Sequence, residues 1–322
     1  MRIFITGGCG FIGSNIAEYH LNKGDEVHVI DNLTTGTLKN IEPFTSNPKF
    51  KFYEGNILDW PEMEKEVKWA ERVYHFAAVV GIFKVISEPI NVVASNIEGT
   101  RHLLDVIKKS GAKPVVVIAS SSSVYGNSPK PLLTETDDLI IKQPKDALAT
   151  YSTSKLTTEI IALAYYHGDK IPIILPRLFN TVGPRQTGRY GMVVPRFVNQ
   201  ACSNEPLTIF GDGSQTRSFC DVRDSVVALD MIASRPDTIG EIINVGNDYE
   251  ISINDLAKLV GKCVGHEVEV KYIPYEEAYG MPYQDITQRR PNIAKMKSLI
   301  PFKHQWSLEK TVNDLIERFR KK

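Results

Sequence analysis

The sequence predicts an α/β protein in which a doubly wound parallel sheet carries a smaller α/β lobe. A short strand, a glycine-rich turn, a helix and a second strand follow one another within residues 2–31. Apolar strands and helical segments then alternate as far as residue 175, and this alternation is typical of a parallel sheet covered by helices on both faces. The 322 residues are enough for one large domain with an appendage, or for two domains.

The composition excludes several classes of protein. Hydrophobic residues make up 42% of the chain, and 38 basic side chains balance 38 acidic ones, so we expect neither a nucleic-acid-binding surface nor a polybasic membrane face. Cys9, Cys202, Cys220 and Cys263 are scattered without a C-x-x-C pair, which indicates free thiols in a reducing compartment and no metal site. A glycine turn as early as Gly7 leaves no room for a signal peptide, and no apolar run reaches the ~20 residues of a membrane span. We expect a soluble cytoplasmic protein.

The first 31 residues predict a dinucleotide-binding unit. The predicted strand 2–6 leads into the turn 7–13, a helix follows to about Lys23, and a second strand, 26–31, ends at Asp31. Glycines in this turn let the backbone approach a pyrophosphate at the helix N-terminus. The Asp31 carboxylate can accept hydrogen bonds from both adenosine ribose hydroxyls and would repel a 2′-phosphate, which favours NAD over NADP. The glycine spacing is G-x-x-G-x-x-G, and the unit is Rossmann-like.

The strands that follow place further residues at the same edge of the sheet. Predicted strands occupy 51–53, 73–78, 115–118 and 171–175, with helices over 89–110 and from 151 to about 167. The carboxyl ends of parallel strands meet in one crevice. Ala77, Ser121 and Pro176 are therefore expected to face the cleft. Asn96 falls inside a helix, where its side chain either holds backbone or water near the site or is a satisfied core amide.

The pattern changes after residue 175. A loop rich in Gly, Pro and Arg covers 183–191; Arg185 and Arg189 in it either bind a phosphorylated ligand or are simply solvated. The remaining predicted helices are 195–204, 221–234, two or three after 252 and a last one from about 307, and the predicted strands are 207–210, 242–245 and 268–273. We predict a dinucleotide-binding domain over 1–178, to which 221–247 return, and a second lobe over 179–220 and 248–322.

Residues 120–155 carry the candidate chemistry. Tyr151 and Lys155 lie four residues apart, so a helix places them on one face. A tyrosine with a pKa near ~10 is a poor base at neutral pH, and a nearby cation is expected to lower that pKa. Ser121, at the end of a strand, can hold the substrate oxygen that Tyr151 deprotonates. The Tyr-x-x-x-Lys spacing alone is short enough to arise by chance.

Taken together, the motifs resemble those of the extended short-chain dehydrogenase/reductase family. Within it, the chain is most similar to the NAD-dependent nucleotide-sugar epimerases and dehydratases of the UDP-glucose 4-epimerase type. The resemblance covers nearly the whole chain and is carried by residues 6–13, 31–33, 75–78, 121–126, 151–155, 177–180 and 211–217.

The resemblance implies roles for individual residues. The catalytic residues it implies are Tyr151, Lys155 and Ser121. Those implied to bind NAD are Gly7, Gly10, Phe11, Ile12, Gly13, Asp31, Asn32, Asn56, Ile57, Phe76, Ala77, Ala78, Asn96, Tyr151, Lys155 and Pro176. Those implied to bind the nucleotide sugar are Ser121, Ser122, Tyr151, Asn180, Val194, Phe210 and Arg217. Asn56 stands where the family usually has Asp, and Ser218-Phe219 follow Arg217 where Asp-Phe or Asp-Tyr is commoner.

The resemblance also distinguishes reactions. Dehydratases carry an Asp-Glu pair after the catalytic residue and decarboxylases a Glu before Val-Tyr-Gly; Ser122 and Ser123 occupy these positions here. We therefore predict a 4-epimerase acting on a UDP-hexose, UDP-N-acetylhexosamine or UDP-hexuronate. Residues 287–293 are nevertheless similar to a decarboxylase pattern, so a decarboxylase or dehydratase is the alternative. A non-catalytic NAD sensor is a third possibility. The family commonly forms homodimers through the two long helices.

Overall fold

The computed structural model describes residues 1–141, 143, 146–188, 191–280 and 285–321. Arg189 of the predicted phosphate-binding loop lies outside these residues. An eight-stranded parallel sheet runs in the order β12-β7-β5-β4-β1-β2-β3, with β6 beside β7. Its strands are β1 (Arg2–Thr6), β2 (Glu26–Asp31), β3 (Phe50–Glu54), β4 (Arg72–His75), β5 (Val115–Ile118), β6 (Ser120–Ser121), β7 (Ile173–Leu178) and β12 (Ile242–Val245). The predicted fold class is confirmed.

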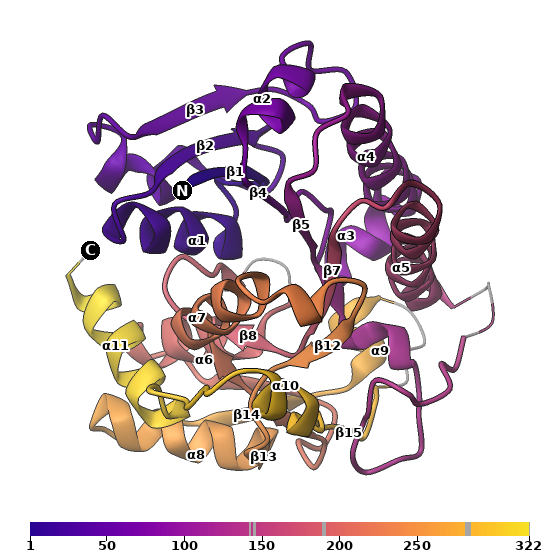
Figure 1. Cartoon of the computed structure of the whole chain (residues 1–322). Helices are drawn as coiled ribbons and strands as arrows, with labels where there is room; N and C mark the ends of the chain where they lie inside the picture. The colour runs from indigo at the N-terminus through magenta and orange to yellow at the C-terminus, as the bar shows by residue number, and fades with distance from the viewer. Residues whose placement is uncertain (142, 144–145, 189–190, 281–284, 322) are drawn as a thin grey trace.

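Helices cover both faces of this sheet (Figure 1). They are α1 (Phe11–Asn22), α2 (Met63–Trp69), α3 (Ile82–Ser87), α4 (Pro89–Ser110), α5 (Ala147–Asp169) and α7 (Val222–Ala233). Successive side chains of a strand point to opposite faces. In β1, Ile3 and Ile5 accordingly join the core under α1 and α7, whereas Phe4 joins the core under α2, α4 and α5. Burial on both faces explains why the middle of β1, Ile3-Phe4-Ile5, is apolar at successive positions rather than alternating.

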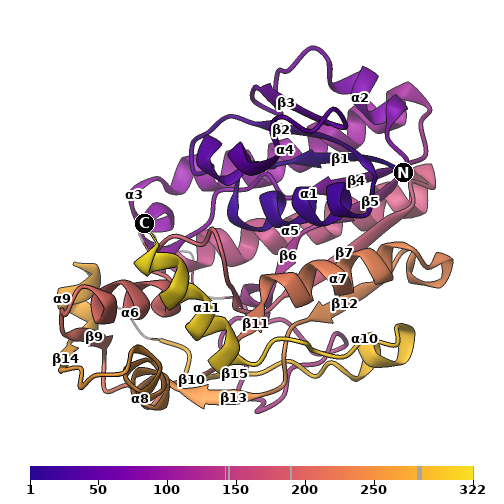
Figure 2. The ribbon, with the colours of Figure 1, turned by 90° about the vertical axis from the view of Figure 1, so that its left-hand side faces the viewer.

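A smaller group of elements lies at the opposite end of the molecule from β3 (Figure 2). It has a three-stranded sheet β13-β10-β15 and the strand pairs β11-β8 and β14-β9. The strands are β8 (Thr181–Val182), β9 (Leu207–Phe210), β10 (Thr216–Ser218), β11 (Cys220–Asp221), β13 (Glu250–Ser252), β14 (Val270–Ile273) and β15 (Gln288–Arg289). The helices are α6 (Val193–Cys202), α8 (Ile253–Val264), α9 (Tyr275–Tyr279) and α11 (Leu308–Arg320). Side chains of α6, α8 and α11 form its core. Helix α10 (Ala294–Leu299) instead packs against β12, and its Met296 joins the core of the large sheet. The domain boundaries stay a prediction.

Several predicted strand boundaries are wrong; the strand predicted over 268–273, for example, begins at Val270. The strand predicted over 171–175 runs from Ile173 to Leu178, because its end pairs with β6 and β12. The strand predicted over 73–78 ends at His75, and the Ala77 N–H donates instead to the Thr6 hydroxyl at 3.2 Å. Helices α2 and α3 were not predicted. Among the described residues, no helix combines the length and apolar character needed to span a bilayer.

The glycine turn gives a test of the close packing between β1 and α1. A β-carbon on Gly13 would lie 2.2 Å from the Gly7 carbonyl oxygen. We expect Gly13→Ala to lower the free energy of unfolding by about 3 kcal/mol, because the backbone must move apart. Gly168→Ala is the matched control: nothing lies within 4 Å of its β-carbon position, and the change should stabilise α5 by about 0.5–1 kcal/mol. Urea denaturation measures both, and equal effects would contradict the packing argument.

Candidate active site

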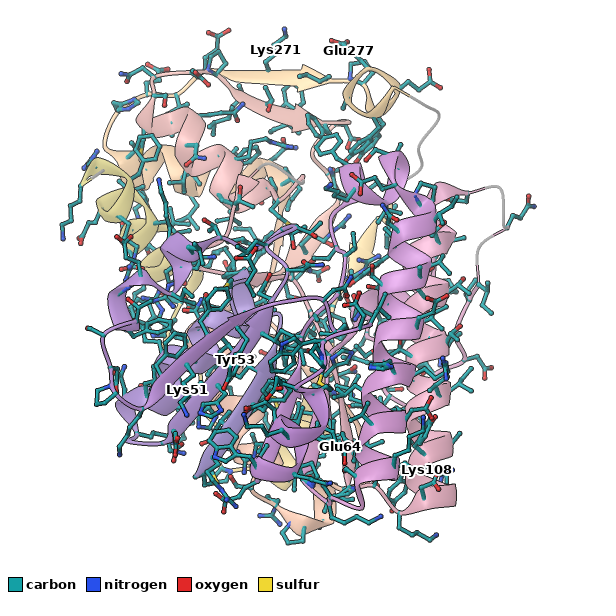
Figure 3. All side chains as sticks on the ribbon, turned by 90° about the horizontal axis from the view of Figure 1, so that it is seen from above. Lys51, Tyr53, Glu64, Lys108, Lys271 and Glu277 are labelled. Carbon is teal, nitrogen blue, oxygen red and sulfur yellow. The ribbon has the colours of Figure 1, made fainter. Side chains whose placement is uncertain are left out.

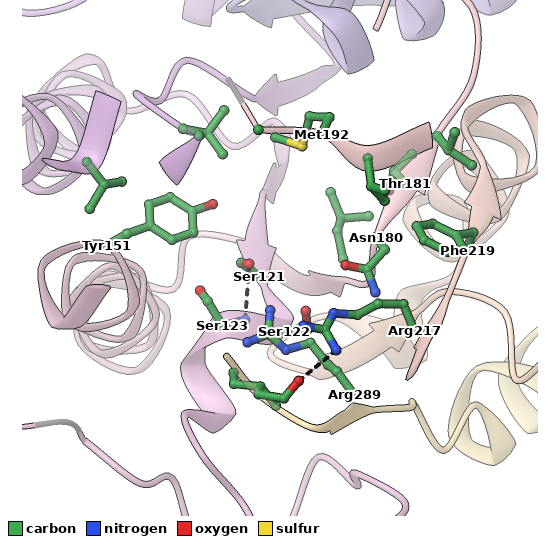
Figure 4. A pocket seen from close by; sticks show the side chains of 18 of the residues that line it. Ser121, Ser122, Ser123, Tyr151, Asn180, Thr181, Met192, Arg217, Phe219 and Arg289 are labelled. Atoms are coloured by element: carbon green, nitrogen blue, oxygen red, sulfur yellow. Dashed lines mark hydrogen bonds between the residues drawn. The ribbon is translucent and has the colours of Figure 1, made fainter. Parts of the chain in front are cut away.

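One pocket of about 470 Å³ collects residues from both groups of elements. Figure 4 shows Tyr151, the serines after β5, and Asn180 and Arg217 around it. The predicted site residues that line it are Phe11, Ile12, Phe76, Ala78, Ser121, Ser122, Tyr151, Lys155, Asn180, Val194, Phe210 and Arg217. The predicted residues that do not line it are Gly7, Gly10, Gly13, Asp31, Asn32, Asn56, Ile57, Ala77, Asn96 and Pro176.

The serine run forms a tight turn at the pocket wall. Ser121 ends β6, and its hydroxyl accepts a hydrogen bond from the Ser123 N–H at 3.2 Å, capping the 3-10 helix Ser122–Tyr125. The Ser121 side chain is also close enough to Tyr151 to lower the pKa of its phenol. The phenol of Tyr151 and the hydroxyl of Ser121 therefore lie close together, where the hydroxyl of a substrate could hydrogen-bond to both.

Burial dominates the ionisation of this pair. It raises the pKa of Tyr151, and the hydrogen bond with Ser121 and the charge of Arg289 oppose that rise. The sequence argument expected Lys155 to be the cation that lowers the tyrosine pKa. In the structure, Lys155 instead donates to the Ala119 carbonyl oxygen at 2.9 Å. Burial lowers the pKa of Lys155 to about 8, with the Glu159 charge opposing, so the lysine is largely charged at neutral pH.

The glycine turn fits a dinucleotide. Gly7 has φ +75°, in the region that favours glycine, and its β-carbon would lie 2.6 Å from the Ala77 backbone nitrogen. Gly10 caps α1 without a side-chain hydrogen bond, which leaves the helix N-terminus to a phosphate. Asp31 accepts from the N–H groups of Cys9 and Leu33 at 2.9 and 2.8 Å, and these bonds hold its carboxylate at the end of β2. NAD would be held by these residues.

Asn96 supports the pocket from behind. Its side-chain oxygen accepts from the Val79 N–H at 2.9 Å, and its amide nitrogen donates to the Ser154 hydroxyl at 3.0 Å. It is 1% exposed. Of the two interpretations from sequence, holding backbone near the site agrees with these contacts, because Val79 stands between the pocket residues Ala78 and Val80.

The sequence analysis predicted Arg217 but missed Arg196, Asp285 and Arg289, which also line the pocket. Arg217 and Arg289 are paired across the parallel strands β10 and β15, so their side chains leave the sheet on the same face. Arg217 donates to Asp285 at 2.7 Å. The only feature of the sequence that pointed to Arg289 was its place in residues 287–293, the segment similar to decarboxylases. No feature of the sequence pointed to Arg196 or Asp285. Arg185, a candidate phosphate ligand, instead pairs with Glu18 at 2.9 Å.

Unpaired polar atoms concentrate in this pocket. Among the described residues, six buried side-chain polar atoms have no hydrogen-bond partner. Five of them belong to residues that line the pocket: Ser123, Thr181, Gln186, Arg196 and Gln215. Each unpaired buried group costs about 1–3 kcal/mol. Such a concentration is typical of a site that binds a polar ligand.

The chain is similar in sequence to decarboxylases of nucleotide sugars. The model of the NAD dependent epimerase/dehydratase family matches residues 3–246. The UDP-N-acetyl-alpha-D-glucosaminuronate decarboxylase of Bacillus cytotoxicus is 33% identical over 99% of this chain and 98% of that protein. UDP-glucuronic acid decarboxylase 2 of Arabidopsis thaliana is 31% identical over 100% of this chain and 69% of that protein.

Solved structures of epimerases and dehydratases share the fold. The UDP-glucuronic acid 4-epimerase from Bacillus cereus, in complex with UDP-glucuronic acid and NAD, has a TM-score of 0.88 and 29% identity, with 100% of this chain and 99% of that chain covered. The dTDP-glucose 4,6-dehydratase from Bacillus anthracis, in complex with NAD, has a TM-score of 0.86 and 27% identity, with 100% and 97% covered. The resemblance seen in the motifs is confirmed, and the chain belongs to the NAD-dependent epimerase/dehydratase family.

Proposed function

We propose that the chain catalyses the NAD-dependent epimerisation of a UDP-linked hexuronate at carbon 4. The observation that carries the proposal is the wall around Tyr151, where Ser122 and Ser123 stand in place of carboxylates. Among the described lining residues the single carboxylate is Asp285, and it is paired with Arg217. The wall therefore offers a base for an alcohol and no carboxylic acid for a second chemical step.

The residues divide the first step between them. Ser121 orients the 4-hydroxyl, and Tyr151 takes its proton. As the phenolate, Tyr151 becomes a neutral phenol when it takes this proton, and the charged Lys155 on the same helix face favours the phenolate before the transfer. NAD, when bound, supplies a hydride acceptor at carbon 4 and returns the hydride. If the 4-keto sugar presents its other face before the hydride returns, Tyr151 gives back the proton and the configuration is inverted. The presence of both Tyr151 and Lys155 supports catalysis over the alternative of a non-catalytic NAD sensor.

The charges of the wall support an acidic sugar. The described lining residues include four cations, Lys155, Arg196, Arg217 and Arg289, against one carboxylate. Arg289 lines the same pocket as Tyr151, and its charge lowers the pKa of that phenol. A guanidinium matches the geometry of a carboxylate. The similar proteins include a UDP-glucuronic acid 4-epimerase and decarboxylases whose names refer to uronic acid sugars.

Decarboxylation of the same substrate is the second candidate. Oxidation of a hexuronate at carbon 4 makes a β-keto acid, which loses carbon dioxide when its carboxylate is free to align with the ketone. A decarboxylase must then deliver a proton to carbon 5. The sequence similarity to decarboxylases favours this outcome. Serines in place of acids favour epimerisation. An arginine that binds the sugar carboxylate would also keep it from aligning with the ketone at carbon 4.

A substrate panel separates these outcomes. We expect the purified protein, incubated with UDP-glucuronate, to give a product of unchanged mass inverted at carbon 4 and no net reduction of NAD. UDP-glucose and UDP-N-acetylglucosamine should react far more slowly, because they lack the carboxylate. NMR identifies each product, and Tyr151→Phe is the inactive control. Release of carbon dioxide would move the assignment to the decarboxylase, and inertness towards all three sugars would contradict the proposed function.

Arg289 provides a test of the acidic sugar. We expect Arg289→Gln to weaken binding of UDP-glucuronate roughly thirtyfold, since a charge-assisted hydrogen bond contributes about 2 kcal/mol. Binding of UDP-glucose should change by less than about threefold, because that sugar has no carboxylate. Calorimetric titration of both ligands in the presence of NAD measures the difference. An equal loss for the two sugars would mean that Arg289 supports the wall without recognising the sugar.

We also propose that the chain forms a homodimer through α4 and α5, which lie side by side along one edge of the molecule (Figure 3). Ile90 on α4 is 81% exposed and Ile160 on α5 is 61% exposed, and exposed apolar side chains on two packed helices support an interface there. We expect a dimer by light scattering at micromolar concentration. Ile90→Glu combined with Ile160→Glu should yield monomers, and a monomeric wild-type protein would contradict the proposal.

A further inference from the structure

A buried carboxylate lies directly behind the pocket. Glu159 follows Lys155 by one turn of α5 and Tyr151 by two turns, so all three share one helix face. Its side chain is 2% exposed. One carboxylate oxygen accepts from the Ser120 hydroxyl at 2.5 Å and from Arg177 Nε at 2.8 Å, and the other accepts from the second Arg177 nitrogen at 2.8 Å. Both oxygens are thus fully engaged below the reacting groups.

These bonds join α5 to the strands of the sheet. Arg177 lies on β7 and is aligned with Ser120 on β6. Ser120 stands between two functional points: the carbonyl of Ala119 accepts from Lys155 at 2.9 Å, and Ser121 follows directly. The hydrogen bond from Ser120 to Glu159 therefore fixes the Ala119 carbonyl oxygen that accepts from Lys155. It also fixes the end of β6, which carries Ser121.

The same carboxylate sets the charge balance around Lys155. The other charged or titratable groups that face this region are Tyr151 on α5, His75 on β4, Arg177 on β7, Arg289 on β15 and Tyr125, whose ring lies 4.8 Å from the Arg177 guanidinium. His75 carries no charge, because burial lowers its pKa to about 3, and Lys155 adds to that effect. Glu159 is the carboxylate that raises the pKa of Lys155 against burial. Without its charge, two cations would remain close together in a buried place.

We propose that Glu159 is a positioning residue that keeps Lys155 protonated and anchors the strand bearing Ser121. This inference rests on the proposed function only where it is tested by measuring turnover. The alternative is that Glu159 and Arg177 form an ion pair that only stabilises the fold and does not influence the reaction.

Glu159→Gln tests the charge while keeping the size of the side chain. We expect kcat at pH 7.5 to fall at least tenfold and the alkaline limb of the kcat–pH profile to move down by a unit or more. The direction follows because a lower lysine pKa means that the required proton is lost at a lower pH. Activity should therefore partly return as the pH is lowered to 6.5.

Asp230→Asn is the matched control. Arg72 and Asp230 form another buried ion pair, at 2.6 Å, beside the start of β4 and away from the pocket. Loss of the Arg72–Asp230 ion pair should lower the free energy of unfolding without shifting the kcat–pH profile. A Glu159→Gln profile that coincides with wild type after scaling, or an equal shift in Asp230→Asn, would reduce Glu159 to a structural role.

For a second variant, we expect the alkaline limb of the kcat–pH profile to shift in the opposite direction. This variant alone tests the proposal if Glu159→Gln does not fold. Arg177→Gln leaves the Glu159 charge unbalanced, so the alkaline limb should move to higher pH; an unmoved limb would overturn the proposal. Titration of Lys155 by NMR in protein carrying ¹³C-labelled lysine needs no turnover. A shifted lysine titration without activity on any sugar would refute the proposed function alone, whereas turnover with an unshifted titration would refute this inference alone.

Discussion

The hydrogen bond from Lys155 to the Ala119 carbonyl oxygen, 2.9 Å long and buried, is the contact on which the site depends. It ties α5 to the chain between β5 and β6, and so fixes Tyr151 relative to Ser121. Hydrogen bonds to a charged group contribute about 1.5–3 kcal/mol, but the position they impose matters more here. Asn96 and Glu159 secure the same helix against neighbouring segments, which leaves the phenol and the serine hydroxyl little freedom.

The parts of this arrangement that follow from local patterns could be predicted from the sequence. The i, i+4 spacing of Tyr151 and Lys155 and the strand–glycine–helix order before Asp31 depend on neighbours in the chain. Arg289 and Asp285 enter the pocket only because β15 pairs with β10, a contact between segments about 70 residues apart, and no local pattern reports such pairing. The influence of Lys155 on the Tyr151 pKa was misjudged for a similar reason, since that pKa responds first to burial, then to Ser121 and then to Arg289, which is distant in the sequence.

Epimerases and decarboxylases of hexuronates share one intermediate, and this explains why whole-chain similarity does not separate them. In our proposal, the fold, the glycine turn and the Tyr–Lys–Ser group serve the common oxidation at carbon 4. The outcome is then set by a few side chains: whether an acid reaches carbon 5, and whether the carboxylate is held. In this chain serines occupy the acid positions and cations dominate the wall, which is why we place it with the epimerases.

The most direct test of this account follows the hydrogen of carbon 4. UDP-glucuronate deuterated at carbon 4 would be incubated with the protein and NAD in ordinary water, and the product analysed by mass spectrometry and NMR. Our account predicts an epimer of unchanged mass that keeps deuterium at carbon 4, because the same hydride returns to the same carbon. A product that has lost carbon dioxide and gained a solvent hydrogen at carbon 5 would contradict it.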